Sequence, residues 1–235
     1  MDKPVVLLDP GHGGKDPGAS HFGLQEKDLN LALALETAER LSGIEVLLTR
    51  DRDIYLSLAD RAAFSKEVAP DFFLSLHANA GGGRGFESFI YSGLTAGHPV
   101  ELMQEALHEE IMAVLKKRQI VDRGLKEAAF YVLKYNPYPA VLIESLFLDN
   151  EWEAGIWKEP AFVGELAGGV AAGIRAALAA ADSTGGTAPV IGPDSPLYTV
   201  QVGAFIHYEN AKRRLAEARA AGFADAFIYR KQHMQ

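Results

Sequence analysis

Two histidines in this sequence directly follow short apolar segments. His12 comes after residues 5–10 (VVLLDP), and His77 comes after residues 72–76 (FFLSL). Both are followed by glycines, which let the backbone bend closely around a bound group. An imidazole at the exposed end of a strand is well placed to bind a metal, although a lone histidine in such a loop is more often a structural residue that bonds the backbone. Each histidine therefore needs partners before a metal site can be inferred.

Two glutamates are the candidate partners. Glu26 stands just ahead of the first expected helix, where a carboxylate is also favoured by the helix dipole alone. Glu144 interrupts an apolar segment, residues 140–148, where a carboxylate is costly unless it has a partner or a task. Two histidines and one glutamate form the ligand set of many catalytic zinc sites, with water as the fourth ligand. A buried salt bridge remains an equal alternative for Glu144.

Composition narrows the chemistry. The chain has 235 residues, of which 48% are hydrophobic and 23% charged, and this is ordinary for a globular protein. It has no cysteine, so His, Asp or Glu must hold any transition metal. The net charge of −8 argues against a general surface for nucleic acids or anionic membranes. We also expect no membrane span and no secretory signal, and therefore either synthesis in the cytoplasm or a leader already removed.

Alternating apolar and amphipathic segments predict the elements that position these residues. Strands are expected at 5–8, 46–49, 72–76, 86–91 and 141–143, and helices at 28–41, 57–68, 99–117 and 160–181. Asp28 is expected to cap the first helix, and Ser57 with Asp60 forms a capping-box signature for the second. The alternation predicts an α/β fold with a mixed, largely parallel central sheet flanked by helices. The strand at 86–91 is expected at an edge or antiparallel.

The carboxyl ends of parallel strands meet at one edge of such a sheet, and ligands bind there. His12, His77 and Glu144 each lie at or just after the end of an expected strand. We therefore expect all three on one rim. His108, in contrast, lies among glutamates on an expected helix, so we predict that it is solvated rather than functional.

The chain changes composition after residue 181. Residues 182–197 are rich in Gly, Pro, Ser and Thr, which is typical of a linker. Residues 198–235 then suggest a strand, a helix and a strand, but are too few for a core of their own. We predict a catalytic domain at 1–181, a linker at 182–197 and a partial α+β module at 198–235.

Five segments occur in an order that matches a known family. They are 9–19 (DPGHGGKDPGA), 23–28 (GLQEKD), 49–50 (TR), 75–79 (SLHAN) and 139–144 (PAVLIE). Together they closely resemble the zinc-dependent N-acetylmuramoyl-L-alanine amidases of amidase type 3, over residues 4 to about 181. The resemblance implies that His12, Glu26 and His77 bind Zn2+ and that Glu144 is the catalytic carboxylate. It also implies cleavage of the amide between N-acetylmuramic acid and L-alanine in peptidoglycan.

Segment 198–205 (YTVQVGAF) resembles the start of a SPOR repeat, which implies binding to glycan strands stripped of stem peptides. An amidase followed by such a segment is similar to the sporulation autolysins that are made in the mother cell and act on its wall. One departure from the family pattern is Leu146, which stands where glycine is common and bears on the shape of the pocket.

Two alternatives stay open. A zinc peptidase that cuts within the stem peptide would use the same ligands, but the sequence has no HExxH helix. A catalytically silent peptidoglycan-binding protein is argued against by the intact set of His12, Glu26, His77 and Glu144.

Overall fold

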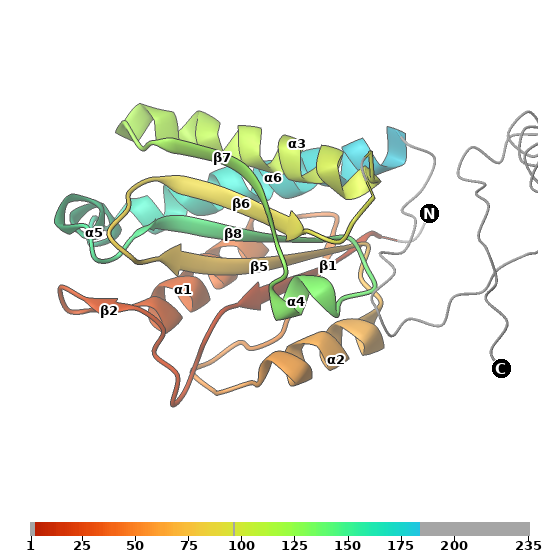
Figure 1. Cartoon of the computed structure of the whole chain (residues 1–235), viewed down its shortest axis with the longest axis horizontal. Helices are drawn as coiled ribbons and strands as arrows, with labels where there is room; N and C mark the ends of the chain where they lie inside the picture. The colour runs from red at the N-terminus through yellow and green to blue at the C-terminus, as the bar shows by residue number, and fades with distance from the viewer. Residues whose placement is uncertain (1–2, 96, 184–235) are drawn as a thin grey trace, which may run out of the picture. The chain divides into compact units, whose positions relative to one another are not determined.

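A central sheet organises residues 3–95 and 97–183, which are the residues that this computed structural model describes. It has six strands in the order β4-β1-β5-β8-β6-β7 (Figure 1). The bounds are Val5–Pro10 for β1, Glu45–Leu48 for β4, Phe72–Asn79 for β5, Phe86–Tyr91 for β6, Asp122–Ala128 for β7 and Ala140–Phe147 for β8. The first four strands of that order are mutually parallel. The expected mixed, largely parallel sheet is confirmed.

The strand β6 reverses direction in this sheet. It pairs antiparallel with β8 on one side and parallel with β7 on the other. The expectation of an edge or antiparallel strand is therefore confirmed by the antiparallel pairing, and β7 forms that edge of the sheet. Strand β7 was not predicted from the sequence, since its pattern is dominated by charged and exposed residues. The reversal brings the carboxyl ends of β5 and β8 to the same edge as the amino ends of β6 and β7.

Helices cover both faces of the sheet (Figure 1). One face packs against α1 (Glu26–Glu39), α3 (Pro99–Leu115) and α6 (Phe162–Ser183). The other packs against α2 (Leu58–Val68) and the single turn α4 (Tyr131–Lys134). The remaining elements are β2 (Ser20–His21), β3 (Leu24–Gln25), the 3-10 helix η1 (Lys116–Arg118) and α5 (Glu151–Trp157).

The start of α2 matches its sequence signature. The Ser57 Oγ accepts a hydrogen bond from the Asp60 backbone N–H, and the Asp60 carboxylate accepts one from the Ser57 N–H. The predicted capping box is thus confirmed. At α1 the prediction is wrong, because the helix begins at Glu26 with Gln25 at the N-cap, and Asp28 lies within its first turn.

Helix α6 carries an apolar stretch, Phe162–Ala181, that is long and apolar enough to cross a membrane by length and composition. The expectation that no such stretch exists is therefore not confirmed. Half of the stretch is buried within the fold. It packs closely on α3, since a Cβ at Gly173 would lie 2.8 Å from the Leu107 carbonyl oxygen. The expected linker and partial module lie outside the described residues, except that α6 continues through 182–183.

Two residues after Glu144, the strand β8 contains a strained residue. Leu146 has a φ of 57°, a left-handed conformation that is unfavourable for residues with a Cβ, and its side chain is fully buried. The register between β5 and β8 shifts at this point. The family pattern, with glycine at this position, therefore matches the backbone that the structure shows. The leucine keeps the same backbone conformation and fills core space.

This strain predicts that glycine at position 146 is more stable than alanine, the opposite of the usual order inside a strand. Both Leu146→Ala and Leu146→Gly lose burial worth about 2–5 kcal/mol, but only glycine tolerates the positive φ. We expect the glycine variant to exceed the alanine variant by about 1 kcal/mol in the free energy of unfolding, measured by urea denaturation. The same pair at Leu74, in the interior of β5, should show the opposite order. A Leu146→Gly protein less stable than Leu146→Ala would contradict the strain.

Candidate metal centre and catalytic carboxylate

His12 lies in the loop that follows β1. Its backbone is left-handed, with a φ of 61°, and the next residue, Gly13, exchanges backbone hydrogen bonds with Asp16 at 2.9 and 3.1 Å. This tight turn points the imidazole toward the start of α1. His12 Nδ1 lies 2.9 Å from Asp16 Oδ2, which leaves Nε2 to face the centre of the site. An imidazole that binds a metal through one nitrogen commonly has its other nitrogen held in this way.

Glu26 is the first residue of α1, and its side chain is buried. Its carboxylate accepts backbone N–H bonds from Ala19 at 2.9 Å and from Ala78 at 3.2 Å. Asn30, one turn along the helix, donates to the same carboxylate at 3.3 Å. The charged side chain is therefore oriented by several groups rather than solvated at a helix end.

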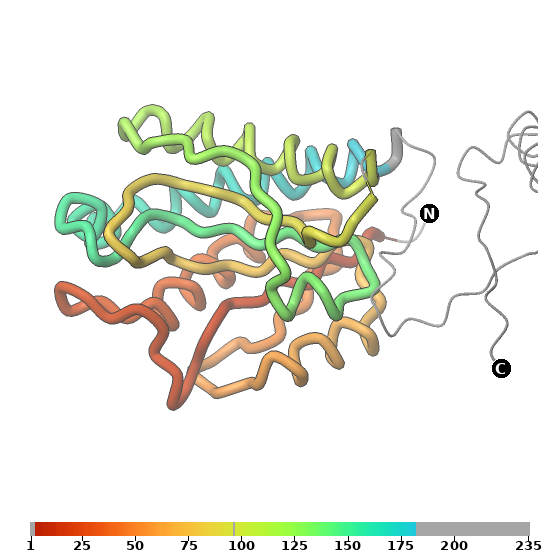
Figure 2. Tube along the Cα trace, viewed as in Figure 1, coloured from red at the N-terminus to blue at the C-terminus, as the bar shows by residue number. Residues whose placement is uncertain are grey.

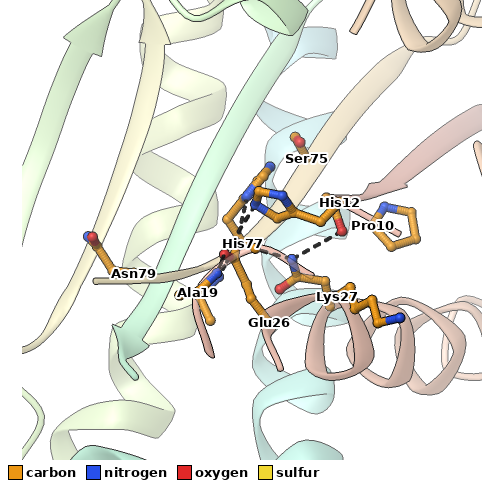
Figure 3. Close-up of polar contacts among 12 residues, drawn as sticks. Pro10, His12, Ala19, Glu26, Lys27, Ser75, His77 and Asn79 are labelled. Carbon is orange, nitrogen blue, oxygen red and sulfur yellow. Dashed lines mark hydrogen bonds and ion pairs between the residues drawn. The ribbon is translucent and has the colours of Figure 1, made fainter. Parts of the chain in front are cut away.

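His77, near the end of β5, completes the group. Its Nδ1 lies 2.9 Å from Glu26 Oε1, and His12 Nε2 lies 3.1 Å from Glu26 Oε2. The two imidazole rings are 5.1 Å apart and nearly perpendicular. Figure 3 shows the three side chains pointing toward one another. One ligand atom from each lies within 4.8 Å of the others, so these residues could hold a single metal ion.

The charges of this group are strongly coupled. Burial acts to lower the pKa of His12, but the carboxylates of Glu26 and Asp16 outweigh it and raise that pKa to about 9. Burial also acts to lower the pKa of His77, but the hydrogen bond with Glu26 outweighs it, so that this pKa is raised. Burial would raise the pKa of Glu26, yet both imidazoles hold it far below its usual range. The site therefore stabilises an ionised carboxylate beside two imidazoles that bind protons more tightly than usual, and a dication could take the place of those protons.

Gly11 allows the imidazole of His77 to approach the β1 loop. A Cβ at this position would lie 2.2 Å from His77 Cε1, a separation that the rigid ring cannot accept. The glycine at this position is therefore required by contact with a candidate ligand.

Two buried arginines hold the backbone of the same loop. Arg61 donates to the carbonyl oxygens of Pro10 and His12 at 2.8 and 2.6 Å, and to the buried carboxylate of Asp9 at 2.6 Å. Arg50 donates to the carbonyl oxygen of Gly11 at 2.9 Å and to that of Lys27, next to Glu26, at 2.8 Å. Arg50 thus joins the two segments that carry candidate ligands.

No role for these arginines was predicted from the sequence, and Arg61 was not singled out at all. Its position inside the helix pattern of α2 carries no signal of its contacts with β1. Arg50 follows an expected strand, as His12 and His77 do, so the strand-end rule could have selected it.

Glu144 lies beside His77. The two residues are direct partners in the parallel pairing of β5 and β8, so their side chains share one face of the sheet. Glu144 Oε2 is buried and has no hydrogen-bond partner among the described residues. Burial raises the pKa of Glu144 to about 7, although the neighbouring His77 opposes that shift. A buried carboxylate with a free oxygen and a pKa near neutrality is typical of a group that transfers protons.

A second carboxylate, Glu87, lies on the other side of Glu144 and is its antiparallel partner in β6. Glu87 is buried, and its carboxylate accepts a hydrogen bond from Asn79 Nδ2 at 2.7 Å. It also forms ion pairs with Arg123, at 2.7 Å, and with Lys126. No functional role was predicted for these residues from the sequence.

His108 is not solvated, and that prediction is wrong. It is buried, with Nδ1 2.9 Å from Ser88 Oγ and Nε2 2.9 Å from Asp122 Oδ1. This resembles a Ser-His-Asp arrangement, but Ser88 is fully buried and inaccessible to a substrate. The sequence feature that could have predicted its burial is the apolar stripe of α3, because position 108 follows Leu107 and lies on the same buried face.

Comparisons with known proteins place this chain in a family. The sequence profile described as N-acetylmuramoyl-L-alanine amidase matches residues 6–176. The chain is 40% identical over 222 residues to the sporulation-specific N-acetylmuramoyl-L-alanine amidase of Bacillus subtilis, which covers 93% of this chain and 82% of that protein. It is also 40% identical over 229 residues to the N-acetylmuramoyl-L-alanine amidase CwlM of Bacillus licheniformis, with coverages of 96% and 85%.

The fold has solved counterparts. The crystal structure of an N-acetylmuramoyl-L-alanine amidase from Clostridium difficile superposes with a TM-score of 0.71 at 33% identity, covering 79% of this chain and all of that one. A SPOR domain profile matches residues 166–230. That match begins ahead of the expected module, and its first part, 166–183, forms most of α6.

Proposed function

Because this chain belongs to the N-acetylmuramoyl-L-alanine amidase family, we propose that it cleaves peptidoglycan with a zinc ion held by His12, Glu26 and His77 and with Glu144 as the catalytic carboxylate. The activity is the hydrolysis of the amide between N-acetylmuramic acid and L-alanine, in a sporulation-related setting. The observation that supports the residue assignment is the convergence of two imidazoles and one carboxylate next to a buried, unpartnered carboxylate oxygen.

The donor set suits zinc in a catalytic role. Imidazole nitrogens and a carboxylate oxygen are its usual ligands in sites that keep one position open, whereas structural sites are closed and mostly use cysteine. When bound, zinc would supply a Lewis acid that polarises the scissile carbonyl and lowers the pKa of water. Asp16 orients His12, and the N–H groups of Ala19 and Ala78 orient Glu26.

Glu144 moves the protons in this proposal. Its carboxylate accepts a proton from the attacking water and donates it to the nitrogen of the leaving L-alanine, as a general base and then a general acid. A pKa of about 7 matches both roles, because the group must accept and release a proton at neutral pH. The fully buried side chains around β8 exclude bulk water from the far side of this carboxylate.

Proton release provides a test of metal binding that does not require turnover. The pKa of about 9 means that the His12 imidazole carries an additional proton at pH 7 in the metal-free protein, and the pKa of His77 is raised as well. Ligation requires the neutral form, so we expect zinc to displace about one to two protons per ion at pH 7 and fewer above pH 9. Calorimetric titrations in buffers of different ionisation enthalpy measure this number. Zinc binding at pH 7 without proton release would contradict the charge arrangement.

A digest of purified peptidoglycan distinguishes the proposed reaction from the alternatives. Mass spectrometry should find free L-alanine amino termini and intact sugars, and a chelator should abolish these products. Newly exposed ends within the stem peptide would instead identify a peptidase. The absence of any product from the zinc-loaded protein would identify a silent binder.

The proposed function extends to where the protein acts and to what its C-terminal segment binds. We propose that the protein acts on the cell wall after synthesis in the mother cell, and that residues 198–235 contribute to binding glycan strands that lack stem peptides. The SPOR match to residues 166–230 supports the second point. Sedimentation with glycan strands, for the full chain and for a chain ending at residue 183, tests it: equal sedimentation of the two would contradict a role for this segment.

A further inference from the structure

A row of charged and polar side chains crosses the sheet beside the candidate metal centre. His77 on β5 is the direct partner of Glu144 on β8, and Glu144 is the direct partner of Glu87 on β6. The next strand, β7, supplies Arg123 and Lys126, which both reach Glu87. From β5 to β7, the row therefore consists of a candidate metal ligand, the proposed catalytic carboxylate, a buried acid and two cations. The family assignment accounts for the first two positions only.

The two cations outnumber the acid that they contact. The Glu87 side chain is 7% exposed, whereas those of Arg123 and Lys126 are 32% and 35% exposed. The Glu87 carboxylate therefore lies beneath the two cations, which separate it from solvent. Among these three side chains one positive charge is in excess, in a chain whose net charge is −8. Neutralising Glu87 needs only one of the two cations.

Both cations keep hydrogen-bond donors available. Within residues 3–95 and 97–183, Arg123 uses Nε for Glu87 and Nη1 for the Arg84 carbonyl oxygen, and its Nη2 has no hydrogen-bond partner. Lys126 Nζ donates to Glu87 alone, although an ammonium group has three donors. The Arg123 guanidinium is also stacked 4.8 Å from the ring centre of Phe147, which fixes its plane. These donors are suited to a carboxylate of a bound ligand.

The spacing fits the peptide part of the substrate. Neighbouring strands lie about 4.8 Å apart, so the cations above Glu87 are on the order of 5–10 Å from Glu144. A peptide advances at most about 3.5 Å per residue, so a carboxylate one or two residues beyond the scissile amide falls in this range. The lactyl carboxyl group is consumed in that amide. The acidic groups of the substrate near the bond therefore belong to the peptide.

We propose that Arg123 and Lys126 form a subsite that binds a carboxylate of the stem peptide on the leaving-group side of the scissile amide. The subsite selects acidic stem peptides over amidated ones. Glu87, which accepts a hydrogen bond from Asn79, holds the two cations in place rather than contacting the substrate. This inference rests on the proposed function, because it takes Glu144 as the reacting centre.

Two substrates that differ in one group test the subsite. N-acetylmuramoyl-L-alanyl-D-glutamate has a free α-carboxylate, and N-acetylmuramoyl-L-alanyl-D-isoglutamine has an amide there. We expect kcat/KM of the wild-type protein to favour the acid about tenfold, mostly through KM. Lys126→Met should bring the ratio near one, and Lys126→Arg should largely restore it. Lys66→Met, which removes an equal charge from the exposed end of α2, should keep the wild-type ratio.

Direct binding separates failure of the subsite from failure of the proposed function. The product dipeptides L-alanyl-D-glutamate and L-alanyl-D-isoglutamine can be titrated into the zinc-loaded wild-type protein by calorimetry, with no turnover and no variant. We expect the acid to bind about tenfold more tightly. Equal binding of the two dipeptides, or a preference that survives Lys126→Met, would overturn the subsite. Selective binding without hydrolysis of peptidoglycan would overturn the function and leave the subsite in place.

Discussion

The Glu144→Gln variant is expected to lose at least about a thousandfold in kcat on peptidoglycan while retaining one zinc per chain. Glutamine keeps the size of the side chain but cannot accept the proton of the attacking water. It should also fit the site without strain, because Glu144 Oε2 is buried without a partner among the described residues. Release of L-alanine amino termini measures the rate, and mass spectrometry of the metal measures zinc.

A matched control for this variant is Glu127→Gln, an exposed glutamate on β7, which β6 separates from β8. It changes the net charge equally and should leave both kcat and zinc content at the wild-type level. Loss of zinc from Glu144→Gln would instead make Glu144 a ligand. Residual activity within tenfold of wild type would remove it from the proton transfer.

The His77→Ala variant should lose zinc as well as activity. His77 contacts Glu26 through Nδ1 at 2.9 Å, and its removal leaves one imidazole and one carboxylate, too few for a stable zinc site. We expect zinc affinity to fall by more than about a hundredfold, since loss of an outer partner alone costs about 10–100-fold. Competition with a fluorescent chelator measures the affinity. Circular dichroism checks that the fold persists.

The control here is His21→Ala, an exposed histidine in β2 on the same rim. It should keep the wild-type zinc affinity, because His21 is not part of the group formed by His12, Glu26 and His77. An unchanged zinc affinity in His77→Ala, or a loss in His21→Ala, would move the metal site elsewhere.

The sequence was sufficient to predict the strands that carry the site. Apolar segments marked β1, β5 and β8, and the strand-end rule brought His12, His77 and Glu144 together, although β5 and β8 continue beyond the expected ends and contain His77 and Glu144. Glu26 was harder, because a glutamate at a helix start has an adequate local explanation. The residues alone offered it as one of two candidate partners, and the resemblance to the amidase family assigned it to zinc before the structure showed its contacts with both imidazoles.

Other features depended on contacts that no local pattern encodes. Strand β7 was missed because it is a polar edge strand, and Arg123 and Lys126 were missed with it. His108 was assigned to solvent because its chain neighbours are glutamates, although the helix period places it beside Leu107. Arg61 reaches Asp9 across 52 positions of sequence. Such pairs form only when the sheet brings distant segments together, as the adjacent traces of β1, β5 and β8 show (Figure 2).

Anomalous diffraction at the zinc edge, from crystals of the zinc-loaded protein, tests the central claim most directly. We predict one strong peak at bonding distance from one nitrogen of His12, one nitrogen of His77 and one oxygen of Glu26, with Glu144 facing the open side without binding the ion. A peak bound to other residues, or no peak in this group at full zinc loading, would contradict the account.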